Sequence, residues 1–95
     1  MTRRPSDLDP ASSVAAYFGA ELRRLRTAAR LTQDQLGTVV NYTGALVGQV
    51  ETARRAPSRD LAERCDQALS TGGTLARLWP LVHRGGFPPW FRGLV

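Results

Sequence analysis

Residues 32–51 read TQDQLGTVVNYTGALVGQVE, and this stretch decides the fold because it predicts two short helices joined by a tight turn. Thr32 is a good N-cap, since its hydroxyl can accept a hydrogen bond from a free amide of the first helical turn. Gln35 can reach back to the amide of Thr32 and complete a capping box. Thr43 repeats the N-cap before the second helix, and Asn41 tolerates the left-handed conformation that ends the first. Helix, short turn, helix is the arrangement that places a second helix in the DNA major groove.

Apolar spacing predicts three more helices around this pair, and therefore an all-α domain of five helices. The expected helices span residues 12 or 13 to 29, 33–40, 44 to 52 or 53, 59–69 behind a Ser58 cap, and 74–83. We expect the first helix to bury one face, made of Val14, Phe18, Leu22, Leu25 and Ala29.

Single positions refine this picture. In the second helix, Leu36, Val39 and Val40 are expected to be buried, and Gly37 to mark a close approach of the third helix. Pro80 lies inside the last predicted helix, where it removes a backbone hydrogen bond, so we expect a kink or an early stop there.

The domain organisation follows from composition. Residues 1–11 are expected to form a flexible N-terminal arm, residues 12–84 the helix-turn-helix DNA-binding domain, and residues 85–95 a tail rich in proline and aromatic residues. Arg3 and Arg4 in the arm could touch DNA, but a frayed terminus is the favoured interpretation.

Net charge and composition limit the classes of function that the chain can have. The 95 residues carry a net charge of +5, supplied by arginine without lysine. A basic excess on a small domain favours a polyanionic partner, most often nucleic acid, although a solvated arginine face remains an alternative. Cys65 and His83 are the lone cysteine and histidine. We interpret Cys65 as a core residue and His83 as a surface or helix-end residue, so we expect no catalytic residues, no metal site and no cofactor.

Two segments carry a resemblance to a known family. GAELRRLRTAARLTQDQLG (residues 19–37) and YTGALVGQVETARRAPS (residues 42–58) resemble the Cro/CI-type, or XRE-family, helix-turn-helix proteins. The resemblance implies a lambda-repressor-like five-helix domain with the helix-turn-helix at its second and third helices.

Further along, residues 61–73, the Leu78-Trp79 pair and the FPPWFR tail resemble the actinomycete WhiJ-like regulators. In those proteins a larger C-terminal domain follows, and a small partner protein is often encoded nearby. The chain ends at Val95, where such a domain would begin. Two alternatives remain open: a truncated chain and a natural short form.

The resemblance also implies roles for individual residues. It implies DNA-phosphate contacts at Gln33, Thr43, Arg54 and Arg55. It implies DNA-base contacts at Gln49, Ala45, Gly44 and Gly48. It implies a structural ion pair between Arg26 and Glu51.

The chain departs from the family pattern at the reading positions. Gly44, Ala45 and Gly48 have no side chain that can hydrogen-bond a base, and Ala45 can at most contact a thymine methyl group. Ala53 replaces a glycine that usually ends the recognition helix. We therefore expect few direct contacts between side chains and bases. Specificity is expected to depend more on Gln49, backbone contacts and DNA shape.

The sequence thus favours a sequence-specific DNA-binding transcriptional regulator of double-stranded DNA, acting in the cytoplasm on the nucleoid. A homodimer formed through the helix at 74–83 and the tail would place two recognition helices about 34 Å apart on an inverted repeat. We expect no membrane association. The alternative is an antitoxin-like or adaptor module with a protein partner and weak DNA affinity; an enzyme is not expected.

Overall fold

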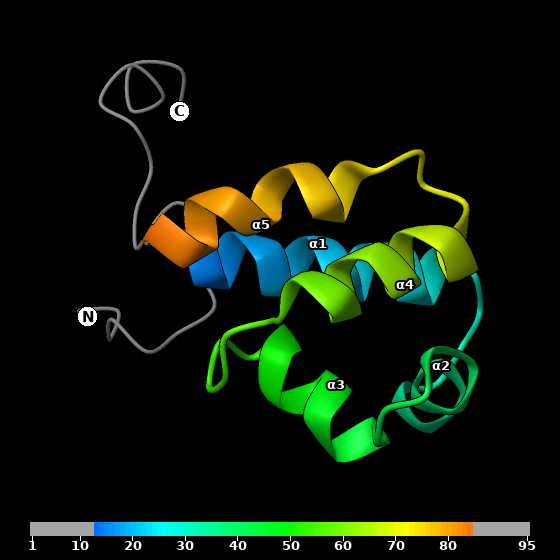
Figure 1. Ribbon diagram of the computed structural model, residues 1–95. Helices are drawn as coiled ribbons and strands as arrows, with labels where there is room; N and C mark the ends of the chain where they lie inside the picture. Colours follow the sequence, from blue (N-terminus) through cyan, green and yellow to red (C-terminus); the bar gives the residue numbers. More distant parts are fainter. Residues whose placement is uncertain (1–12, 85–95) are drawn as a thin grey trace.

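Five helices follow one another in the computed structural model, which describes residues 13–84 (Figure 1). They are α1 (Val14–Ala28), α2 (Gln33–Val40), α3 (Gly44–Glu51), α4 (Arg59–Leu69) and α5 (Thr74–Arg84). No β-strand occurs within residues 13–84, so the predicted all-α fold class is confirmed for this range. The N-terminal arm with Arg3 and Arg4, and the tail at 85–95, lie outside the described residues.

The first four helices begin at hydroxyl caps. The caps are Ser13, Thr32, Thr43 and Ser58, each accepting a hydrogen bond from the amide three residues later at 2.9–3.0 Å. The predicted capping box is confirmed, because the Gln35 side-chain oxygen accepts the Thr32 amide at 2.8 Å. These local hydrogen bonds satisfy amides that the first turn of a helix leaves free, so they fix where each helix starts.

The same four helices end on a left-handed residue that is not glycine. These residues are Arg30 (φ 62), Asn41 (φ 65), Ala53 (φ 60) and Ser70 (φ 54). The amide that follows each one returns to a carbonyl in the last helical turn, as in the hydrogen bond of 2.8 Å from Tyr42 to Gly37. This is the Schellman ending, which glycine adopts most easily. The role predicted for Asn41 is confirmed, and Arg30 and Ala53 carry strain where glycine is the easier residue.

A side chain from α4 caps the start of α5. The residue before α5 is Gly73, which has no side chain to serve as a cap. Asp66 replaces it: its carboxylate accepts the amides of Leu75 at 2.9 Å and Ala76 at 2.7 Å, and also the hydroxyl of Thr71. Asp66 is buried, and these hydrogen bonds compensate for the burial of its charge.

The core lies where all five helices meet. Its buried apolar residues are Val14, Ala16, Phe18, Leu22, Leu36, Val40, Val47, Val50, Leu61, Ala62, Cys65 and Leu75. Two burial predictions are wrong. Val39 is 62 % exposed, because the narrow buried face of α2 takes Leu36 and Val40 instead. Ala29 is exposed, because α1 has already ended at Ala28.

Two glycines let helix backbones approach each other closely. A Cβ at Gly19 of α1 would stand 2.5 Å from the carbonyl oxygens of Val50 and Glu51 in α3. A Cβ at Gly37 of α2 would stand 2.8 Å from the backbone of Thr43 and Gly44. The predicted close approach at Gly37 is therefore confirmed. These two close contacts allow α3 to pack tightly against α1 and α2.

Helix α5 covers the side of the core opposite α3 (Figure 1). It continues past Pro80 to Arg84, so the early stop suggested for that proline does not occur. Leu75 is buried, and Leu78, Trp79 and Val82 are half-buried against the core. Most of the apolar surface of α5 therefore packs against the core of the same chain, and a smaller part stays accessible.

Trp79 ties α5 to the turn before α4. Its indole N–H donates to the carbonyl of Pro57 at 3.0 Å, and the guanidinium of Arg59 lies 5.1 Å from its ring centre. His83 stacks on the same ring, with centroids 4.8 Å apart, and is exposed at the end of the helix as predicted.

Candidate nucleic-acid interface

An ion pair between α1 and α3 holds α3 in place. Arg26 Nε donates to Glu51 Oε2 at 2.6 Å and Arg26 Nη2 to Glu51 Oε1 at 3.1 Å, which confirms the predicted pairing. Arg26 also donates from Nη1 to the carbonyl of Leu31 at 2.7 Å, where the chain enters α2. Its side chain is 11 % exposed and that of Glu51 is 2 % exposed, so water barely reaches the pair. The hydrogen bond to Glu51 raises the pKa of Arg26.

Gln33, at the first position of α2, joins this network. Its Nε2 donates to Glu51 Oε1 at 3.1 Å, so the residue expected to contact a phosphate also braces the ion pair. Gly48 of α3 faces the same amide: a Cβ there would stand 3.1 Å from Gln33 Oε1. Gly48 therefore leaves room for the Gln33 side chain beside α3.

A second glycine of α3 makes room for another side chain of α2. A Cβ at Gly44 would stand 1.8 Å from Asp34 Oδ1 and 2.9 Å from the Asp34 Cα. The missing side chains at Gly44 and Gly48 are thus replaced in space by Asp34 and Gln33. The position of Asp34 is not predicted from the sequence, because nothing in its spacing relates α2 to the start of α3.

The outer face of α3 retains few polar side chains. Thr43, Ala45, Gln49 and Thr52 are exposed there, whereas Gly44 and Gly48 are half-buried against α2. The Thr43 hydroxyl caps the helix by accepting the amide of Leu46 at 3.0 Å. The Thr52 hydroxyl donates back to the carbonyl of Gly48 at 3.0 Å. Gln49 is therefore the longest polar side chain that this face presents to a ligand.

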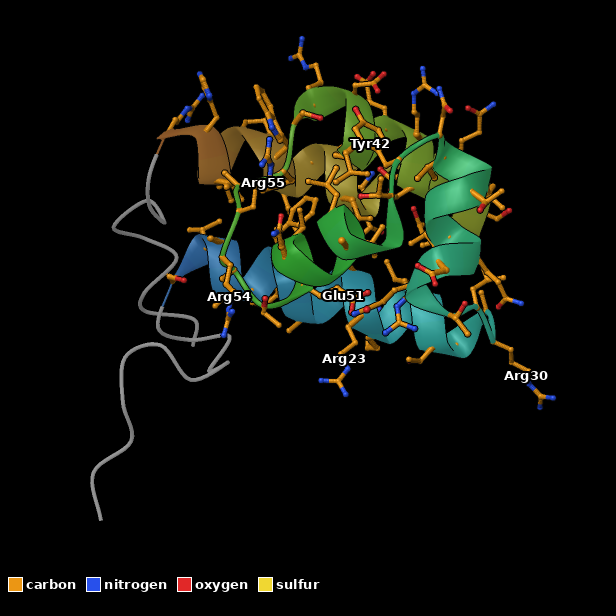
Figure 2. The ribbon with its side chains drawn as sticks, turned by 90° about the horizontal axis from the view of Figure 1, so that it is seen from below. Arg23, Arg30, Tyr42, Glu51, Arg54 and Arg55 are labelled. Carbon is orange, nitrogen blue, oxygen red and sulfur yellow. The ribbon has the colours of Figure 1, made fainter. Side chains whose placement is uncertain are left out.

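The turn after α3 carries two free arginines. Arg54 and Arg55 are exposed, and their amides bond the carbonyl of Gln49 at 2.8 Å and 3.2 Å. Within residues 13–84 neither guanidinium has a hydrogen bond or an ion pair. The backbone is thus fixed while both charges stay available to a ligand. Figure 2 shows both residues on the turn that follows α3.

A further polar cluster braces the other end of the helix pair. The Tyr42 hydroxyl, between α2 and α3, donates to Asp60 Oδ2 at 2.7 Å. Arg64 pairs with the same carboxylate at 2.8 Å. The hydrogen bonds from these two donors lower the pKa of Asp60, and the one from Tyr42 has the larger effect. The cluster joins the interhelical turn to α4. In Figure 2, Tyr42 lies on the opposite side of α3 from Glu51.

Comparison with known proteins identifies the family. A family model described as helix-turn-helix domain matches residues 17–79, about two-thirds of the 95-residue chain. The chain belongs to the helix-turn-helix domain family. In this helix-turn-helix domain, α2 and α3 are the pair that names the family, and the five helices fit the lambda-repressor-like fold. No curated protein and no solved structure matches the chain significantly.

Membership indicates a DNA-binding domain with a regulatory role. The arrangement fits this chemistry, since an exposed helix flanked by cationic side chains can enter a groove while arginines contact phosphates. In the described part of the helix-turn-helix domain, no three His, Cys, Asp or Glu residues are grouped so that they could hold a metal ion. None of the helices described is both long enough and apolar enough to cross a membrane.

Proposed function

We propose that this helix-turn-helix domain is a sequence-specific DNA-binding transcriptional regulator, located in the cytoplasm on the nucleoid. The observation that carries the proposal is the Arg26–Glu51–Gln33 network around the buried Glu51 carboxylate, which fixes α3 while its outer face stays exposed. Preorganised docking elements lower the entropy lost on binding. The XRE-family and WhiJ-like sequence resemblance supports a regulatory role as well.

In this proposal, α3 enters the major groove and Gln49 carries most of the base readout. A glutamine can hydrogen-bond adenine through two bonds, and Ala45 can contact a thymine methyl group. Gly44 and Gly48 face Asp34 and Gln33 of α2, so they contribute no hydrogen bond to a base. Specificity beyond these contacts would come from the shape and deformability of the DNA.

Phosphate contacts would position α3 in the groove. Gln33 and Thr43 lie at the N-terminal ends of α2 and α3, where free amides and the helix dipole favour an anion. Arg54 and Arg55 add two charges that have no partner among residues 13–84. Such contacts fix register and give affinity without reading sequence.

We further propose that the domain binds an inverted repeat as a homodimer. An eight-residue recognition helix with one long polar side chain reads few base pairs, and two copies related by a twofold axis double that readout. The proposed dimer surface is α5 with the tail at 85–95. Leu78, Trp79 and Val82 keep part of their surface accessible, which supports this choice.

The deciding experiment is selection of bound duplexes from a random-sequence pool, followed by gel-shift titration at several salt concentrations. A regulator of this kind yields an enriched inverted repeat with half-sites about 10 base pairs apart. Gln49→Ala should narrow the gap between selected and random DNA, whereas Gln67→Ala, on the exposed side of α4, should not. Absence of DNA binding at low salt would refute the proposal.

The scarcity of polar side chains on α3 favours a second candidate, an antitoxin-like or adaptor module with a small partner protein. Val39, 62 % exposed on α2, supplies an apolar contact point for such a partner. This function predicts negligible DNA affinity at low salt together with co-purification of a small acidic protein. The same gel-shift titration therefore separates the two candidates.

A further inference from the structure

The arginines of this domain divide into two groups by their contacts. Those that have a partner are Arg24 with Glu21, Arg26 with Glu51, Arg59 with Trp79, Arg64 with Asp60, and Arg77 with the carbonyl of Gly72. Those whose guanidinium group has no hydrogen bond, ion pair or ring contact among residues 13–84 are Arg23, Arg30, Arg54, Arg55 and Arg84. Four of these five belong to α1, its exit, or the turn after α3, and only Arg84 belongs to α5.

The position of Arg26 shows where its neighbours on α1 point. Residues 23 and 26 are three positions apart within α1, so they lie on the same face of the helix. Arg26 on that face contacts Glu51 of α3. Arg23, one turn earlier, therefore flanks this ion pair on the edge of α1 that faces α3. Arg30 lies two residues past the end of α1, in a left-handed conformation. Arg24 is turned to another side and pairs with Glu21 at 2.6 Å.

In Figure 2, Arg54, Arg23 and Arg30 follow one edge of the molecule, and Glu51 lies inward of that edge, between α3 and α1. All three side chains are exposed.

We propose that Arg23 and Arg30 form a second phosphate-contacting row on α1 and its exit, which extends the row begun by Arg54 along one DNA strand. The inference rests on the proposed DNA-binding function and adds a contact surface outside the helix-turn-helix pair. Guanidinium groups suit this role, because they bind phosphate oxygens through paired, charge-assisted hydrogen bonds. The Arg26–Glu51 pair positions the row, because it fixes α1 relative to α3.

The backbone at Arg30 supplies independent support. Arg30 has a positive φ of 62°, a conformation that glycine adopts at less cost. The chain thus places a charged side chain at a position where glycine would favour folding. If Arg30 served the fold alone, replacing it with glycine would leave DNA binding unchanged. If Arg30 serves DNA binding, glycine at this position should weaken binding.

The first test compares Arg23→Gln and Arg30→Gln with Arg24→Gln in the full chain, by titrating a random-sequence 20-base-pair duplex at several salt concentrations. Each of the first two variants should lose about fivefold to tenfold in affinity at 0.1 M salt, and the slope of log K against log salt should fall by about one. Arg24→Gln also removes one charge from α1, but this arginine is paired with Glu21. The slope of log K against log salt should therefore equal that of the parent chain.

The second test uses glycine. Arg30→Gly should raise the melting temperature and weaken DNA binding together, a combination that a structural role does not give. Ser70→Gly relieves the same backbone strain at φ 54 at the end of α4, and should raise the melting temperature with unchanged affinity.

The outcomes separate this inference from the function on which it depends. If the parent chain binds no DNA at low salt, the DNA-binding function itself fails, and this inference fails with it. If the parent binds and the Arg23 and Arg30 variants keep its affinity and salt slope, only the second phosphate row is overturned. The same holds if Arg24→Gln weakens binding as much as they do.

Discussion

Gly19 of α1 lies directly against the backbone of Glu51 in α3, so closely that a Cβ at position 19 would stand 2.5 Å from the Glu51 carbonyl oxygen. The obstacle is a helix backbone, which cannot move aside as a flexible side chain can. The absence of a side chain at this one position thus sets how near the recognition helix comes to α1.

Gly19→Ala should therefore lower the free energy of unfolding by about 2 kcal/mol, because overpacking forces the two helices apart. Gly48→Ala is the matched control. Its new methyl group would meet only the movable end of Gln33, and alanine favours helix, so stability should stay level or rise by up to about 1 kcal/mol. Urea unfolding of both variants measures the difference. Equal stability of the two would contradict the close approach.

The Arg26–Glu51 pair predicts strong coupling between its members. Glu51→Leu or Arg26→Met alone leaves one buried charge without its partner and should cost about 3 kcal/mol of stability. The double variant Arg26→Met with Glu51→Leu removes both charges and should recover much of that loss. A double-mutant cycle by urea unfolding tests this, and additive losses would show that the two residues act independently.

Ala53 predicts a stabilising substitution. It ends α3 at φ 60, a conformation in which alanine is strained and glycine is not. Ala53→Gly should raise the free energy of unfolding by about 1 kcal/mol, which is a rise of about 4–8 °C in melting temperature for a domain of this size. Ala28→Gly, inside the last turn of α1, is the control with the opposite sign, since glycine weakens a helix there. Thermal melts that show the same sign for both would be inconsistent with this backbone account.

Cys65 should be unreactive in the folded chain. It is fully buried, and burial raises the pKa of its thiol to about 12, so the reactive thiolate is scarce at neutral pH. A thiol-specific chromogenic reagent at pH 8 should label the folded chain far more slowly than the chain in denaturant. Since the folded pKa is raised, the unfolded state loses this proton first, and stability should fall as the pH rises from about 9 towards 12. Rapid labelling under native conditions would rule out this environment.

Asp60 should titrate below an ordinary aspartate. The hydrogen bond from Tyr42, and then that from Arg64, lower its pKa. Because the folded pKa is depressed, its contribution to stability is present above the unfolded value and is lost as the pH falls through the folded one. Tyr42→Phe should move the carboxyl pKa, followed by carbon-detected NMR, back towards its usual range. An unchanged titration in that variant would remove the tyrosine as the cause.

Local hydrogen bonds made the helix boundaries predictable. Thr32, Thr43 and Ser58 each cap an amide three residues away, and Asn41 ends α2 through its own conformation, so short windows of sequence contain the necessary information. Burial within an eight-residue helix was less predictable. Val39 and Val40 are neighbours of identical type, and only the position of α4 and the other packed helices decides that Val40 is inside.

Contacts between distant residues account for what the sequence did not reveal at the candidate site. The Tyr42–Asp60 hydrogen bond joins residues 18 apart, and the Trp79–Pro57 bond joins residues 22 apart. The placement of Asp34 over Gly44 requires knowledge of the α2–α3 crossing. The Arg26–Glu51 pair spans 25 residues and was nevertheless predicted, because the family resemblance supplied it.

The cap that Asp66 provides for α5 has a consequence for the order of folding. The amides of Leu75 and Ala76 gain their acceptor only after α4 has formed and the intervening turn has closed. An isolated segment of 11 residues without a cap is too short to hold a helix in water. Helix α5 is therefore a late-forming element, and amide hydrogen exchange at its first turn reports the opening of the junction between α4 and α5.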